Sequence, residues 1–154
     1  MCIPSHGRAH ELGLRIAGRA SSVSDESVMR RDIRDEDLHD TLTSFYAIIA
    51  VDPLLAQYFE KVDMSIHMPR IVAFWSTLLF RTRSYSGNAF RPHLEMPGLT
   101  AEHFAFWVGS LESVVDESFA GPSASLMKEM AHRIAYSMQL RLGISPFEPF
   151  RATA

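Results

Sequence analysis

In the stretch Tyr85-Ser86-Gly87-Asn88-Ala89-Phe90-Arg91-Pro92-His93-Leu94-Glu95-Met96-Pro97-Gly98, two glycines and two prolines interrupt a chain that is otherwise patterned for helices. Glycine and proline both oppose a regular helix or strand, so we expect an irregular loop here. A loop of about a dozen residues or more is long for a connection between helices, and such loops commonly carry function. Its candidate functional side chain is His93, which stands among apolar and aromatic neighbours.

A helix is expected on each side of this loop. Before it, residues 65–81 carry apolar positions at spacings of four, three and four, which is typical of one helical face: His67, Ile71, Phe74 and Leu78, with Trp75 beside the third. His67 heads this stripe, so we expect its side chain to point into the protein. After the loop, a helix begins near Thr100, a suitable N-cap. Its buried stripe is expected to contain Phe104, Trp107, Leu111 and Val115.

Three further segments complete the predicted helices. Residues 35–50 begin with acidic side chains, which favour a helix N-terminus, and their apolar face consists of Leu38, Leu42, Phe45 and Ile49. Residues 53–59 are typical of a short helix opened by proline. Residues 123–142 form the last helix, which ends before Gly143 and turns inward Met127, Met130, Ile134 and Met138. No segment shows the alternation typical of a strand, so we expect an all-α fold.

Composition favours one folded domain. The 154 residues are 47% apolar and 21% charged, and the formal net charge of -3 provides no bulk attraction to nucleic acid or an anionic membrane. We expect a flexible N-terminal extension (1–32), a helical domain (33–145) and a tail (146–154), with Met29 as an alternative start of translation. The single cysteine, Cys2, excludes an intrachain disulfide. No apolar run approaches the ~20 residues of a membrane span, and we expect a cytoplasmic protein. We also expect a monomer.

Two of the seven histidines stand where a cofactor site would need them. His67 is expected on an inward helical face and His93 follows 26 residues later, so the two could face each other across a planar macrocycle such as haem. Large apolar side chains to surround it are Phe45, Phe59, Phe74, Trp75, Phe104 and Trp107. The alternative stays open here, because a histidine on an apolar face is often a hydrogen-bonded core residue and aromatic residues are often core. His39, His103 and His132 look solvent-facing or marginal and receive no role.

Several motifs at fixed intervals resemble one family. They are Phe45-Tyr46, Phe59 thirteen residues later, His67-Met68-Pro69-Arg70 with Phe74-Trp75, Tyr85-Ser86-Gly87, His93-Leu94-Glu95-Met96-Pro97 eight residues after that tyrosine, and His103-Phe104 with Trp107. Together they resemble the truncated (two-over-two) haemoglobins, most closely group III, over residues 35–143. Ala89 departs from the pattern, since the family often has proline there. The extension before Asp35 has no counterpart in the short members.

The resemblance implies a globin-like two-over-two helical sandwich around haem b, with a truncated globin domain over residues 33–145. It implies His93 as the proximal ligand of the iron, and a distal pocket that contains Tyr46, Trp107 and His67. The lining that it implies consists of Phe45, Phe59, Ile71, Phe74 and Trp75. Arg91 or Arg70 is a candidate partner of the haem propionates. The ligands implied are small diatomic molecules such as O2, NO and CO.

The distal residues implied by the resemblance suggest what the site is for. Tyr46 and Trp107 can each donate a hydrogen bond to a bound ligand that carries partial negative charge, and hydrogen bonds to charged groups are worth about 1.5–3 kcal/mol each. Two such donors would slow ligand loss by a hundredfold or more, at about 1.4 kcal/mol per tenfold. We therefore expect redox chemistry of O2, NO or peroxide, served by a separate reductase, and not oxygen transport. The alternatives are a non-catalytic binding or sensing module and a haem-free helical interaction protein.

Overall fold

The computed structural model describes residues 29–146. The first 28 residues of the predicted extension, with Cys2, lie outside this range, as does the predicted tail from residue 147 onward. Within it the elements are η1 (Asp35–Asp37), α1 (Leu38–Ile49), η2 (Ala56–Tyr58), α2 (Met64–Phe80), α3 (Arg91–Leu94), α4 (Ala101–Ser118) and α5 (Pro122–Arg141), without a strand. The all-α prediction is confirmed, and the four long helices lie close to their predicted bounds.

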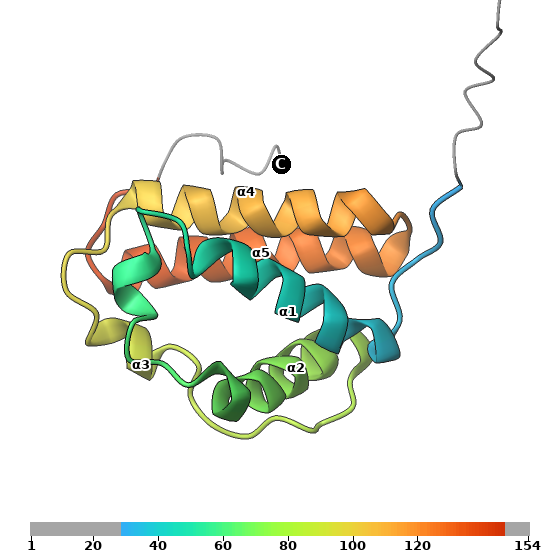
Figure 1. Cartoon of the computed structure of the whole chain (residues 1–154). Helices are drawn as coiled ribbons and strands as arrows, with labels where there is room; N and C mark the ends of the chain where they lie inside the picture. Colours follow the sequence, from blue (N-terminus) through green and yellow to red (C-terminus); the bar gives the residue numbers. More distant parts are fainter. Residues whose placement is uncertain (1–28, 147–154) are drawn as a thin grey trace, which may run out of the picture.

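The four long helices form a two-over-two sandwich (Figure 1). The helices pair as α1 with α2 and α4 with α5, and the two pairs meet through α1–α4 and α2–α5 contacts. The short helix α3 makes no comparably extensive contact with another element. Helix packing therefore closes the interior where the four long helices meet, and α3 lies outside this packing.

The prediction of an irregular loop over residues 85–98 was wrong at four positions, because Arg91–Leu94 forms a single helical turn. Pro92 is compatible with it, since the first N–H groups of a helix have no acceptor within the helix. The Asn88 side-chain carbonyl serves those donors instead, because it accepts from the N–H groups of Phe90 (3.0 Å) and Arg91 (3.3 Å). The turn thus carries His93 on a short, capped helix.

A closed apolar core lies between the long helices. The side chains with no exposed surface include Leu38, Leu42, Phe45 and Ile49 of α1, Leu111 and Val115 of α4, and Met127 and Ala131 of α5. The stripes predicted for α1, α4 and α5 from the 3.6-residue period therefore face this core, as expected. No helix among residues 29–146 combines the length and apolar character needed to cross a membrane.

The segment before η1 is held against the beginning of α5. The Asp32 carboxylate accepts hydrogen bonds from the backbone N–H groups of Ser123 (2.9 Å) and Ala124 (2.8 Å). Gly121 lets this carboxylate approach, since a Cβ there would lie 2.5 Å from the Asp32 Cγ atom, at a backbone φ of +151°. Partial burial opposes ionisation of Asp32, but these hydrogen bonds outweigh it and lower the pKa of the carboxyl.

Candidate functional site

His93 is half-buried on α3 and makes one hydrogen bond that determines its chemistry. Its Nδ1 lies 2.9 Å from the carbonyl oxygen of Ala89. A carbonyl can only accept, so Nδ1 carries the proton and Nε2 keeps its lone pair. Burial lowers the pKa of His93, and the hydrogen bond to Ala89 opposes that effect only in part. The imidazole is therefore held neutral, with Nε2 as a potential metal ligand.

The chain before α3 is fastened along the end of α2. Hydroxyl groups link Ser76 to Thr82 and Thr82 to Ser84, at 2.8 Å each. The backbone N–H of Tyr85 then donates to the Thr77 hydroxyl at 3.1 Å, and the Tyr85 ring meets the edge of Phe74 at 5.3 Å. These contacts bring the chain alongside α2 before it turns toward His93.

Two hydrogen-bond donors lie within a network of aromatic rings. The Phe45 ring contacts Tyr46 edge-on at 4.9 Å and Trp107 at 5.8 Å, and Tyr46 contacts Phe59 at 6.0 Å. Burial raises the pKa of Tyr46 to about 12, and the Trp107 indole, which hydrogen-bonds to the phenol, opposes that effect. The phenol therefore stays protonated at neutral pH, so Tyr46 keeps an O–H donor, whereas the single Trp107 N–H is directed at the phenol oxygen. The structure thus brings together two of the three residues predicted for the distal side.

The third predicted distal residue, His67, is exposed, so the expectation that it points inward was wrong. Helix α2 buries Met68, Trp75 and Ser76, because α1 and α5 both pack on that stripe. Adjacent residues on a helix point about 100° apart, so His67 falls beside the buried stripe and not on it. The sequence pattern located an apolar flank correctly but placed its centre one residue too early.

The predicted lining residues, together with the distal Tyr46 and Trp107, divide into two groups. Phe45 and Trp75 are 0% and 2% exposed, so they belong to the closed core and support the site from behind. The other members are half-buried, although they pack against the same core: Tyr46, Phe59, Ile71, Phe74 and Trp107. These mostly aromatic side chains come from α1, α2, α4 and the residue after η2, and we call them the half-buried aromatic face. Such a surface fits a flat, largely apolar cofactor better than a polar ligand.

His103 is a residue whose place the sequence pattern missed. Its position was expected to be solvent-facing or marginal, but the side chain is 8% exposed. Its Nδ1 accepts from the Thr100 backbone N–H at 3.1 Å and lies 2.7 Å from the Thr100 hydroxyl. The spacing of Thr100 and His103 is that of a capping box, a signal that could have revealed this role. The two arginines considered for propionate pairing, Arg70 and Arg91, are exposed.

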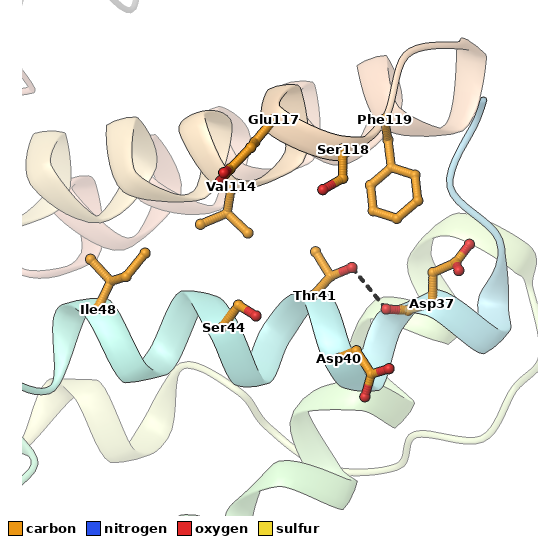
Figure 2. Close-up of a pocket in the computed structure, with 9 residues that line it drawn as sticks. All are labelled: Asp37, Asp40, Thr41, Ser44, Ile48, Val114, Glu117, Ser118 and Phe119. Carbon is orange, nitrogen blue, oxygen red and sulfur yellow. Dashed lines mark hydrogen bonds between the residues drawn. The ribbon is translucent and has the colours of Figure 1, made fainter. Parts of the chain in front are cut away.

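A separate groove lies between α1 and α4 (Figure 2). It encloses about 320 Å³ and is lined by Asp37, Asp40, Thr41, Ser44, Ile48, Val114, Glu117, Ser118 and Phe119. The α1 residues of this groove recur at helical spacing, and Tyr46 lies about 180° around the helix from them. The groove is therefore not the aromatic face described above. Its three carboxylates and lack of a histidine make it unsuitable for a haem.

Comparison with solved structures shows the fold. The chain is similar to the crystal structure of a group III truncated hemoglobin from Campylobacter jejuni, with a TM-score of 0.65 and 23% sequence identity. The match covers 71% of this chain and 91% of that one. No model of a protein family matches the sequence, and no curated protein matches it. The truncated globin fold expected from the sequence is thereby confirmed.

Proposed function

We propose that this protein binds haem b through Nε2 of His93 and acts on small diatomic ligands. When bound, haem supplies an iron centre that takes up O2, NO or CO and takes part in their redox chemistry. The observation that carries the proposal is the state of His93: neutral, half-buried, with Nδ1 on the Ala89 carbonyl. A histidine that ligates a metal through one nitrogen commonly donates the other N–H to a carbonyl, which holds the ring in place.

The half-buried aromatic face would hold the cofactor. Phe59, Ile71 and Phe74 keep part of their surface uncovered although each packs against the closed core. Covering apolar surface stabilises a complex by about 25 cal/mol per Å². A large flat ring system placed there would therefore gain affinity from these side chains and water would be kept from the site. His67 lies on the same flank of α2 as Ile71 and Phe74, but its side chain is exposed, so it would border this face.

Tyr46 and Trp107 would govern how long a ligand stays. Tyr46 can donate, because its raised pKa, about 12, keeps its proton in place across the physiological range. The Trp107 N–H is directed at the phenol oxygen and would orient that hydroxyl. A hydrogen bond to a charged or strongly polarised group is worth about 1.5–3 kcal/mol, so the Tyr46 donor would slow release by roughly ten- to a hundredfold. Slow release favours redox handling of O2, NO or peroxide over oxygen transport. A separate reductase would then supply the electrons.

The first test is a haem titration of the purified apoprotein. We expect one equivalent of haem to give a Soret band, and His93→Gly to lose the spectrum of an imidazole-ligated ferrous haem. Added imidazole should restore that spectrum in His93→Gly, because the small molecule replaces the missing ring. His67→Ala, a change at an exposed histidine, is the matched control and should behave as the unmodified protein. A wild-type protein without a Soret band, or a His93→Gly spectrum identical to wild type, would refute the proposal.

The second test separates redox chemistry from simple binding. The oxygenated protein is mixed with one equivalent of NO, and nitrate is measured against a haem-only background. We expect nitrate to form within one turnover. Slow oxygen release without nitrate above that background would contradict the redox assignment and support a binding or sensing module.

A further inference from the structure

Tyr58, the last residue of η2, is bonded to the segment that follows His93. Its hydroxyl donates to the carbonyl oxygen of Pro97 at 2.7 Å, across 39 positions of sequence. Between His93 and Pro97 the chain is itself a closed turn, because the N–H of Met96 donates to the His93 carbonyl at 3.2 Å. A restraint applied at Pro97 is therefore passed to His93 through a short, hydrogen-bonded piece of backbone.

The phenol of Tyr58 is fixed on its other sides as well. Its ring meets the edge of the buried His103 at 5.7 Å, and His103 in turn caps the start of α4. Gly98 brings the chain around the hydroxyl, since a Cβ there would lie 3.7 Å from the Tyr58 oxygen and the backbone φ is +77°. Only glycine adopts such a φ without strain. Tyr58 thus ties η2, the end of the α3 segment and α4 together.

The other end of the α3 segment has its own restraint. The Arg141 guanidinium, at the end of α5, lies 4.2 Å from the centre of the Phe90 ring. Phe90 and Leu99, on either side of α3, also pack against a buried cluster of α4 and α5 side chains. The contacts of Tyr58 and Arg141 add to this apolar attachment of the segment. Figure 1 shows α3 at the end of the molecule where α4 begins.

The residue after Tyr58 contacts the distal donor. Phe59 meets the Tyr46 ring edge-on at 6.0 Å, so adjacent residues of one short segment touch Tyr46 on one side and the His93 segment on the other. We propose that Tyr58 is a positioning residue, whose hydrogen bond to Pro97 sets the place of His93 relative to Tyr46 and thereby the strength of the bond between His93 and iron. This inference rests on the proposed binding of haem by His93.

Tyr58→Phe tests the proposal, because it removes the hydroxyl and keeps the ring against His103. In the haem-free protein, amide hydrogen exchange over residues 91–99 should become about tenfold faster, while exchange in the middle of α4 stays unchanged. One net hydrogen bond, at about 1.4 kcal/mol per tenfold, accounts for that factor. In the ferrous haem-loaded protein, the iron–histidine stretching band should shift or broaden while the haem stoichiometry stays at one.

Two substitutions serve as controls. Tyr136→Phe, at a tyrosine on α5 that is 45% exposed, should change neither the exchange nor the band. Tyr58→p-aminophenylalanine restores a donor on the same ring and should return both the amide exchange and the iron–histidine band toward wild type. This variant keeps a donor, so it also serves as a test if Tyr58→Phe does not fold.

The outcomes are distinguishable. Faster exchange with an unchanged iron–histidine band would overturn the positioning role and leave a bond that only stabilises the fold. Unchanged exchange together with an unchanged band would refute the inference altogether. A wild-type protein that takes up no haem refutes the proposed function itself, and this is seen before any variant is made.

Discussion

Two faces of the same helix, α2, differ in how completely the protein covers them. Met68, Trp75 and Ser76 are buried by α1 and α5, whereas Ile71 and Phe74 on the adjoining flank remain half-buried. Both flanks are apolar, so hydrophobicity does not distinguish them. What differs is the neighbour, because long helices cover one flank, whereas the short α3 makes no comparably extensive contact with any long helix. A chain that leaves aromatic surface uncovered retains a cost of about 25 cal/mol per Å², which a bound cofactor can remove.

The largest effect is expected from truncating neighbouring aromatic residues on these two flanks. Trp75→Ala should lower the free energy of unfolding of the apoprotein by about 3–5 kcal/mol, because it opens a cavity in the closed core. Phe74→Ala should lower it by roughly half as much or less, since that side chain is only partly covered. After correction for the change in apoprotein stability, Phe74→Ala should lower haem affinity more than Trp75→Ala does. Equal losses of apoprotein stability from both substitutions, measured by urea unfolding, would remove the distinction between the two faces.

The aromatic face can also be examined through the ionisation of Tyr46. Burial raises its pKa to about 12, so in the folded apoprotein Tyr46→Phe should remove tyrosinate absorbance that appears only near that pH. An unfolded tyrosine ionises near pH 10, so this residue contributes stability that is present below about pH 10 and is lost as the pH rises toward 12. Should Tyr46→Phe instead delete absorbance that develops around pH 10, the phenol is in contact with solvent and the donor assignment fails.

The smallest effect is expected in the stability of the apoprotein when the pH is lowered. Burial lowers the pKa of His93 below its ordinary value of about 6.5, so the unfolded chain binds a proton there more readily than the folded chain does. The stability that His93 contributes is therefore complete above about pH 6.5 and is lost as the pH falls through that value toward the lower folded-state pKa. We expect the free energy of unfolding of the apoprotein, measured with urea, to fall between about pH 7.5 and pH 5.5. The fall should be smaller for His93→Gln than for wild type. Identical falls for wild type and His93→Gln would count against a buried His93.

Local patterns in the sequence were sufficient for the long helices and for much of the candidate site. Period and caps located α1, α2, α4 and α5, because each long helix has an apolar stripe and recognisable ends. The same patterns failed at three places. His67 was taken for an inward residue, the turn that carries His93 was expected to be irregular, and His103 was expected near solvent. In each case the outcome depends on which element packs alongside, and spacing within one segment carries no information about that.

The sequence by itself determined the all-α architecture, the stripes that face the core and the segment that carries His93, because helix periodicity and glycine and proline positions are local properties. Tertiary structure alone decided which apolar flank is closed and which stays half-buried, since that depends on where α1 and α5 cross α2. It also decided that Tyr58 would reach Pro97 and that His93 would be held neutral by burial and by the Ala89 carbonyl. The reason is that burial and long-range hydrogen bonds exist only once separate segments have packed together.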